Sequence, residues 1–142
     1  MIPRNTPRTP EPNVAIQQIL IVDDSPTERF YLTDILARAG YAVSTAVNGE
    51  EAIDKIRAER PHLILMDVVM PGANGFQVTR SIARDPALSS IPVIICSSKN
   101  QETDRIWGMR QGARDYLVKP VDPGLLLGAI AALDAAQAPA AA

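Results

Sequence analysis

Short, continuously apolar runs alternate with amphipathic stretches along most of this chain of 142 residues. The run "ILIV" at 19–22 lacks the alternation of a half-exposed strand and is typical of a strand buried on both faces. Four later runs have a similar character. The predicted strands are 18–22, 42–46, 63–67, 92–97 and 115–118.

The stretches between these strands repeat their apolar residues at helical spacing. In "DDSPTE", Ser25 suits an N-cap, Pro26 suits the first turn, and Glu28 completes the pattern of a capping box. The inward face of this helix is expected to contain Phe30, Tyr31, Ile35 and Leu36, with Gly40 ending it. The other predicted helices are 49–59, 75–84, 102–111 and 122–133. The helix over 102–111 is expected to be weak because Gly108 interrupts it.

Five successive strand–helix units predict an α/β fold, with a doubly wound five-stranded parallel sheet covered by helices on both faces. Ligands of such sheets bind beyond the carboxyl ends of the strands. The polar residues predicted at these ends are Asp23, Asp24, Asp67, Ser97, Ser98 and Lys119.

Length and composition are those of one domain, predicted at 16–135. It follows a proline-rich arm at 1–15 and precedes an alanine-rich tail at 136–142, both expected to be flexible. A net charge of −2 argues against nucleic-acid binding. The chain has no apolar run of roughly 18 residues and no secretory signal, so no membrane span is predicted. A single cysteine fits a reducing compartment, and we expect a cytoplasmic protein.

Each strand-end residue alone could be a turn former, a helix cap or a solvated charge. Together, however, Asp23, Asp24 and Asp67 would bring three carboxylates to one edge of the sheet. Two charges about 4 Å apart repel by roughly 4 kcal/mol at an effective dielectric of 20. Oxygen ligands suit a hard cation such as Mg²⁺, which would offset this repulsion. Asp67 could then attack a phosphoryl group, with Lys119 and Ser97 contacting its oxygens.

Four segments carry a specific resemblance: "ILIVDDSP", "LILMDVVMPGANGF", "IPVIICSS" and "GARDYLVKP", in that order. Over roughly 18–135 the chain resembles the receiver domain of bacterial two-component response regulators. The resemblance implies a CheY-like, flavodoxin-like fold and phosphorylation of Asp67 by a histidine kinase. Such a protein is a signalling phosphoacceptor rather than an enzyme with a separate substrate.

The resemblance also implies a role for individual residues. Mg²⁺ (or Mn²⁺) would be held by Asp23, Asp24, Asp67 and the backbone carbonyl of Val69. The phosphoryl-binding and switch residues would be Ser97, Ser98, Lys119 and Tyr116. The bond between Lys119 and Pro120 corresponds to the family's cis peptide.

The stretch "WGMRQGARDYLVKPV" is similar to the stand-alone regulators of type IV pili and twitching motility, with the PilH type preferred over the PilG type. This implies a CheA-like or hybrid histidine kinase as one partner. A downstream pilus-control protein would dock on the face of the fourth helix, fifth strand and fifth helix. Candidate contacts there are Trp107, Met109 and Arg110. A monomer or weak homodimer is expected.

Other functions stay open at this point. The chain could drain phosphate from a shared kinase, or act as a scaffold without phosphorylation. An aspartyl-phosphate hydrolase is disfavoured, because such enzymes usually carry a second acid two residues after the nucleophile, where this chain has Val69. Trp107 beside Gly108 could be a core aromatic at a helix break, or part of a helix that shifts on activation. Cys96 is interpreted as a packed structural cysteine.

Overall fold

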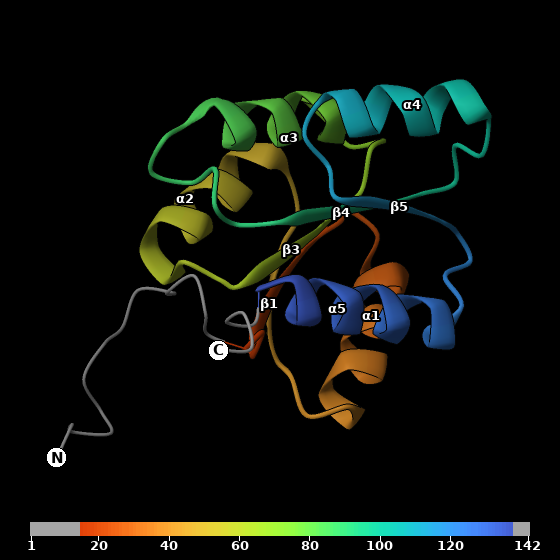
Figure 1. The fold of residues 1–142 in the computed structure, drawn as a ribbon. Coiled ribbons are helices and arrows are strands. Elements are labelled where there is room, and N and C mark those ends of the chain that lie inside the picture. Colours follow the sequence, from red (N-terminus) through yellow and green to blue (C-terminus); the bar gives the residue numbers. More distant parts are fainter. Residues whose placement is uncertain (1–14, 138–142) are drawn as a thin grey trace, which may run out of the picture.

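A computed structural model describes residues 15–137 and contains one sheet of five parallel strands (Figure 1). The strand order is β2-β1-β3-β4-β5. The strands are β1 (Gln18–Val22), β2 (Ala42–Ala46), β3 (Leu63–Met66), β4 (Val93–Ser97) and β5 (Asp115–Val118). The predicted fold class is therefore confirmed.

Five helices alternate with the strands and cover both faces of the sheet (Figure 1). They are α1 (Pro26–Arg38), α2 (Gly49–Glu59), α3 (Gly75–Arg84), α4 (Glu102–Arg110) and α5 (Pro123–Gln137). One core cluster lies between the sheet and α2 and α3, and a second lies between the sheet and α1 and α5. Figure 1 shows α4 beside α3, on the opposite side of the sheet from α1 and α5.

Continuous apolarity in the central strands reflects burial on both faces. Every residue of β3 and β4 is buried, as are Ile19 to Val22 of β1. The parallel register aligns the carboxyl ends: Val22 pairs with Met66 across β1 and β3, and Ser97 pairs with Val118 across β4 and β5. The strand order reverses at β1, so a crevice forms beyond the ends of β1 and β3.

Helix α1 begins and ends as expected but turns a different face inward. Leu32 and Leu36 are its buried residues, whereas Phe30 is 77% exposed, so the predicted inward position of Phe30 is wrong. At 100° per residue, Phe30 lies about 160° around the helix from Leu32. Tyr31 was also predicted to face inward, but it is 37% exposed; its hydroxyl donates to the Val121 carbonyl at 2.7 Å.

Only one of the two hydrogen bonds of the capping box predicted for α1 is present. The Ser25 hydroxyl accepts from the Glu28 N–H at 3.3 Å, as expected. The Ser25 N–H, however, donates to Asp23 Oδ1 at 2.9 Å and not to the Glu28 side chain. The carboxylate at the end of β1 therefore takes the donor that a capping box would have used.

Helix α4 passes through Gly108 without a break. Gly108 is buried, and a Cβ built on it would lie 2.9 Å from Ile95 Cδ1 and 3.1 Å from Tyr116 Cδ2. Trp107 next to it is 48% exposed. The interpretation of a core aromatic beside a helix break is therefore wrong: the glycine packs inward and the tryptophan faces outward.

Element boundaries differ slightly from the predicted ones. β3 and β4 are each one residue shorter than expected, α4 ends at Arg110, and α5 runs to Gln137 rather than 133. Most of the predicted arm (1–14) and tail (138–142) lies outside the described residues. Within residues 15–137, no helix is long and apolar enough to cross a membrane.

Candidate functional site

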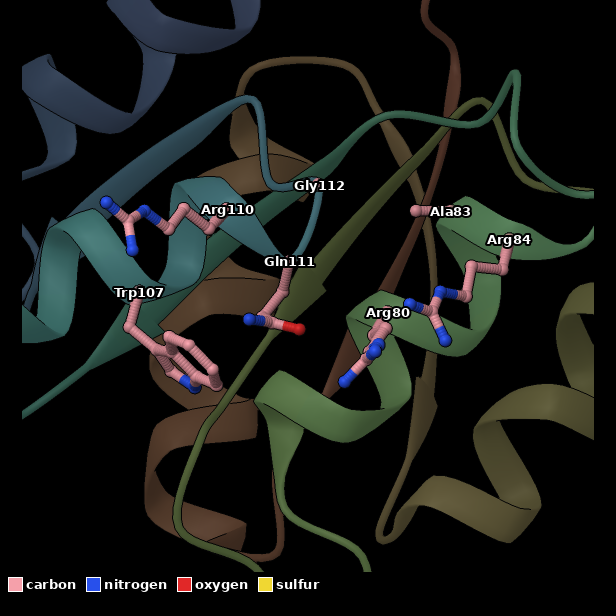
Figure 2. A pocket seen from close by; sticks show the side chains of 7 residues that line it. All are labelled: Arg80, Ala83, Arg84, Trp107, Arg110, Gln111 and Gly112. Atoms are coloured by element: carbon pink, nitrogen blue, oxygen red, sulfur yellow. The ribbon is translucent and has the colours of Figure 1, made fainter.

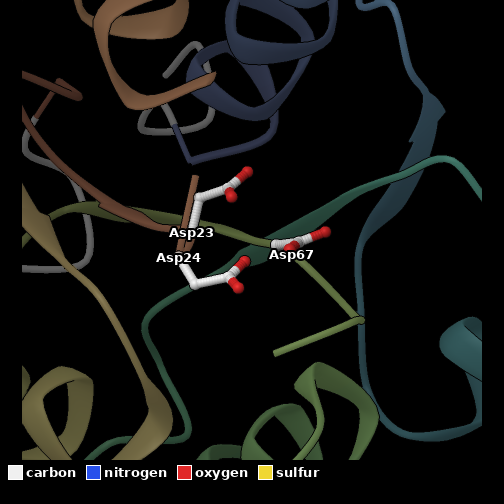
Figure 3. A group of neighbouring side chains, drawn as sticks. All are labelled: Asp23, Asp24 and Asp67. Atoms are coloured by element: carbon white, nitrogen blue, oxygen red, sulfur yellow. The ribbon is translucent and has the colours of Figure 1, made fainter. Parts of the chain in front are cut away.

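Three carboxylates meet beyond the carboxyl ends of β1 and β3 (Figure 3). Asp23 and Asp24 follow β1, and Asp67 follows β3. Each offers an oxygen, and these oxygens all lie within 4.8 Å of one another. Asp23 and Asp67 are buried, with 2% and 6% of their surface exposed, while Asp24 is exposed to solvent. The sheet therefore assembles the acidic cluster that the strand-end pattern predicts.

Lys119, just after β5, provides the positive charge of this cluster. Its Nζ lies 2.7 Å from Asp23 Oδ2 and 3.2 Å from Asp67 Oδ1. Only 14% of the lysine side chain is exposed, so both ion pairs are largely shielded from water. The peptide bond between Lys119 and Pro120 is cis.

One lysine does not balance the acidic cluster. Burial raises the pKa of Asp67, and the neighbouring Asp23 charge raises it further, while Lys119 opposes both effects only partly. Burial tends to lower the pKa of Lys119, but its hydrogen bond to Asp23 and the two nearby carboxylates raise it overall. The site therefore retains a negative excess and an all-oxygen donor set, which suit a hard divalent cation.

Asp23 is held in place by its own neighbours on α1. Its Oδ1 accepts from the Ser25 N–H at 2.9 Å, and its carbonyl accepts from Arg29 Nη1 at 2.8 Å. Arg29 is not among the site residues predicted from the sequence. Its position four residues after Ser25, on the first turns of α1, is the only signal that could have pointed to it.

A buried hydroxyl lies at the end of β4, and a buried phenol lies on the neighbouring strand β5. Ser97 is fully buried, and its Oγ accepts from the Lys99 N–H at 3.1 Å. Tyr116 is 3% exposed, and its hydroxyl donates to the Lys99 carbonyl at 2.7 Å. Burial is the main reason why the pKa of Tyr116 is raised. Both side chains therefore contact the same β4–α4 loop, in which Ser98 is exposed.

The loop after Asp67 depends on Gly75, which is not among the residues predicted from the sequence. A Cβ on Gly75 would lie 1.9 Å from the Asp67 carbonyl oxygen, so no other residue fits there without moving the loop. The Gly75 N–H donates to the Val68 carbonyl at 2.9 Å. The Asn74-Gly75 dipeptide was the available signal. Val69 belongs to the same loop, two residues after Asp67, and is 59% exposed.

The remaining candidate residues lie away from the carboxylates. Cys96 is fully buried, and burial raises its pKa to about 12, as a packed structural thiol requires. His62 precedes β3, at the amino end of the sheet, where its Nδ1 accepts from the Gln17 and Gln18 N–H groups. The exposed side of α4 carries Trp107, Met109 and Arg110.

Comparison with known proteins decides the family. Residues 19–131 match the family model described as "Response regulator receiver domain". This chain belongs to the response regulator receiver family. The family is one of signalling phosphoacceptors, and the chain is related to proteins that consist of a receiver and little else.

Two curated relatives and one solved structure illustrate the similarity of this receiver. Protein PilH of Pseudomonas aeruginosa is 55% identical over 116 residues, covering 82% of this chain and 96% of PilH. Chemotaxis protein CheY of Thermotoga maritima is 36% identical, covering 80% of this chain and 94% of CheY. The crystal structure of a putative response regulator from Chloroflexus aurantiacus superposes with a TM-score of 0.81 at 32% identity, covering 84% and 98% of the two chains.

Proposed function

We propose that this receiver is a single-domain response regulator that a histidine kinase phosphorylates on Asp67. The observation that carries the proposal is the placement of the Asp67 carboxylate. It is 6% exposed, within 4.8 Å of the Asp23 and Asp24 oxygens and 3.2 Å from Lys119 Nζ. A carboxylate in these surroundings can act as a nucleophile toward phosphorus.

In the proposed reaction, an Asp67 oxygen attacks the phosphorus of a phosphohistidine on the kinase. The P–O bond forms as the P–N bond breaks, and the imidazole leaves with the bonding electron pair. Lys119 is already 3.2 Å from Asp67 Oδ1 and would pair with a phosphoryl oxygen. Ser97 Oγ accepts a hydrogen bond from the Lys99 N–H, and its own hydroxyl would turn to donate to another phosphoryl oxygen.

The residues that would hold Mg²⁺ or Mn²⁺ are Asp23, Asp24, Asp67 and the backbone carbonyl of Val69. The excess of carboxylate over lysine charge supports this assignment. When bound, the cation supplies positive charge to the phosphoryl oxygens during transfer. Exposed Asp24 leaves the cluster open to solvent on one side, so a hydrated cation can reach it.

The proposed output is a shift between two conformations of the loop after β4 and of helix α4. Tyr116 is buried here and holds the Lys99 carbonyl, while Gly108 of α4 lies against its ring. A displacement of Ser97 or Ser98 toward a phosphoryl group would therefore change the contacts of Tyr116, and through them the packing of α4. The surface that changes would include Trp107, Met109 and Arg110.

The proposed pathway is control of type IV pili, through protein contact in the cytoplasm. Its support is the 55% identity to protein PilH over 96% of that protein. The upstream partner would be a CheA-like or hybrid kinase, and the downstream partner a pilus-control protein docking on α4, β5 and α5. Measuring the lifetime of the phosphorylated state would help to distinguish such a switch from a protein that only drains phosphate from a shared kinase.

Phosphotransfer from a purified kinase domain carrying radiolabelled phosphohistidine tests the proposal. We expect label to move to this chain within minutes in Mg²⁺, and to stay on the kinase when the chain carries Asp67→Asn or when a chelator is present. A matched control, Asp54→Asn on the exposed side of α2, should accept label like the wild type. Equal labelling of Asp67→Asn would refute the assignment of the acceptor.

A further inference from the structure

A groove between α3 and α4 is not used by the phosphorylation site. It encloses about 300 Å³ and is lined by Arg80, Ala83, Arg84, Trp107, Arg110, Gln111 and Gly112. Apart from Gly112, these are positions i, i+3 and i+4 of α3 and of α4 with its C-cap, so one stripe of each helix borders the groove. Gly112 closes the groove at one end, because a Cβ on it would lie 2.7 Å from Ala83 Cβ.

The arginines of the groove lack partners of opposite charge. Arg80, Arg84 and Arg110 make no ion pair and no side-chain hydrogen bond within residues 15–137, although other exposed arginines do, such as Arg57 with Asp85. Figure 2 shows the Arg80 and Arg84 guanidinium groups on the α3 side of the groove, while that of Arg110 points away from them. The groove therefore presents two guanidinium groups to whatever enters it.

Gln111 adds a polar group to the wall of the groove. It is 92% buried, yet its side-chain amide makes no hydrogen bond within the described part of the chain. The amide projects into the groove between Trp107 and Arg80 (Figure 2). The amide atoms themselves keep contact with solvent, since they are not among the buried, unpartnered side-chain atoms of residues 15–137. The amide is therefore free to hydrogen-bond with a polar ligand that enters the groove.

Trp107 adds a flat apolar wall opposite the arginines. Its indole is 48% exposed and points from α4 toward the groove (Figure 2). An indole face stacks well on a planar ring, and two adjacent guanidinium groups bind phosphate oxygens in a bidentate manner. The amide of Gln111 between them matches the donors and acceptors on the edge of a base.

Helix-end electrostatics explains only part of this arrangement. Arg84 and Arg110 lie in the last turns of α3 and α4, where positive side chains compensate the helix dipole. Arg80 is a turn earlier, and the dipole accounts neither for the position of the Gln111 amide nor for the exposed Trp107 indole that borders the groove. Because helix carboxyl ends face away from the carboxyl edge of the sheet, the groove is separate from the acidic cluster.

We propose that the groove between α3 and α4 binds a nucleotide, with its phosphates on Arg80 and Arg84, its base stacked on Trp107 and its base edge on the Gln111 amide. The volume suits one nucleoside phosphate, at the lower end of ligand pockets of roughly 300–1,000 Å³. A ligand bridging α3 and α4 would also resist displacement of α4. Occupancy of the groove would then bias the conformational shift proposed for phosphorylation.

Trp107 is the chain's only tryptophan, so its fluorescence reports on the groove directly. The experiment titrates the full, unphosphorylated chain with ADP and GDP, beside adenosine and inorganic phosphate as part-ligands. We expect saturable quenching by at least one nucleotide, with each part-ligand binding at least tenfold more weakly. The same titrations are repeated by calorimetry. The proposal would be overturned if neither ADP nor GDP gave saturable quenching or a heat of binding.

Matched variants separate specific binding from general charge. Arg80→Gln and Arg84→Gln should each weaken nucleotide binding about tenfold, the loss expected for one charge-assisted hydrogen bond. Arg38→Gln removes an equal charge from α1, on the other face of the sheet, and should leave the affinity unchanged. Equal weakening by all three variants would overturn the site. Tighter binding of an oligo-glutamate peptide than of either nucleotide would also overturn it, and would assign the groove to an acidic protein segment.

Discussion

At the scale of single residues, the negative charge of Asp67 is only partly stabilised by its surroundings. Burial and the Asp23 carboxylate both raise its pKa, and Lys119 offsets them only in part. The ionised side chain therefore costs stability in the metal-free protein, while it provides the nucleophile that the proposed reaction needs.

The Asp67→Asn variant should consequently be more stable than the wild type when metal is absent. Removing the buried charge relieves repulsion with Asp23 and leaves Lys119 paired with that residue at 2.7 Å. We expect the free energy of unfolding in urea, measured in chelator, to rise by about 1 kcal/mol. Asp54→Asn, which changes an exposed carboxylate, should stay within about 0.5 kcal/mol of the wild type. A loss of stability in Asp67→Asn alone would contradict this account of the site.

The sequence predicts the acidic cluster because it follows from fold class alone. In any parallel sheet the carboxyl ends of neighbouring strands meet, so Asp23, Asp24 and Asp67 could be placed together without coordinates. Gly75 and Arg29 could not, because their contacts depend on the path of one loop and on one rotamer. The pattern of hydrophobic residues carries no information on either.

At the scale of elements, α4 is the helix whose sequence and packing disagree most. Gly108 lowers its helix propensity, yet the same residue lets the helix approach Ile95 and Tyr116 closely. Helix propensity alone counts glycine as destabilising, but at this position the absence of a side chain allows the helix to pack closely on the sheet. This is why the sequence indicated a break where the structure has a continuous, closely packed helix.

Gly108→Ala tests whether packing or propensity dominates in α4. Propensity alone predicts a gain of about 1 kcal/mol, whereas overpacking costs about 1–3 kcal/mol. We expect a net loss of about 1 kcal/mol in unfolding free energy. The control is Gly128→Ala on α5, where a Cβ meets nothing within 4 Å and a gain of about 0.5–1 kcal/mol is expected. Equal gains in both variants would show that Gly108 is not closely packed.

His62, at the amino end of the sheet, should make the free energy of unfolding depend on pH. His62 Nδ1 accepts hydrogen bonds from the Gln17 and Gln18 N–H groups, which only an unprotonated nitrogen can do. Burial lowers the pKa of His62 in the folded chain, although Asp134 opposes it. Below the ordinary histidine pKa the unfolded chain therefore binds a proton that the folded chain resists.

Unfolding free energy should accordingly fall as pH drops from 7 toward 5, and part of this fall should belong to His62. His62 is the only histidine, so His62→Gln removes this titration while keeping an acceptor at the position. Urea unfolding of both proteins across this range measures the difference. Parallel stability curves would mean that the titration of His62 contributes nothing to the pH dependence.

The helix faces show the limit of apolar patterns. Apolar residues on α1 include one on the wrong side, Phe30, and the pattern alone could not separate it from Leu32 and Leu36. Helical phase decides between them, since Leu32, Ile35 and Leu36 lie within one narrow stripe and Phe30 lies opposite. Phase is therefore more informative than the number of apolar residues.

For the whole molecule, the two ends of the sheet have different roles. The carboxyl edge gathers the carboxylates and the lysine, while the groove proposed to bind a nucleotide lies between the carboxyl ends of α3 and α4. Fold class and acidic edge follow from the order of strands and helices. The groove does not, because it depends on how closely α3 and α4 lie side by side, which the residue pattern of neither helix determines.

The central claim is that Asp67 accepts a phosphoryl group in a metal-dependent reaction. Intact-mass measurement after incubation with a small acyl phosphate and Mg²⁺ tests it most directly, beside Asp67→Asn and a sample in chelator. The account predicts one added phosphoryl group on the wild type and none in either control. Addition to Asp67→Asn, or equal addition in chelator, would contradict it.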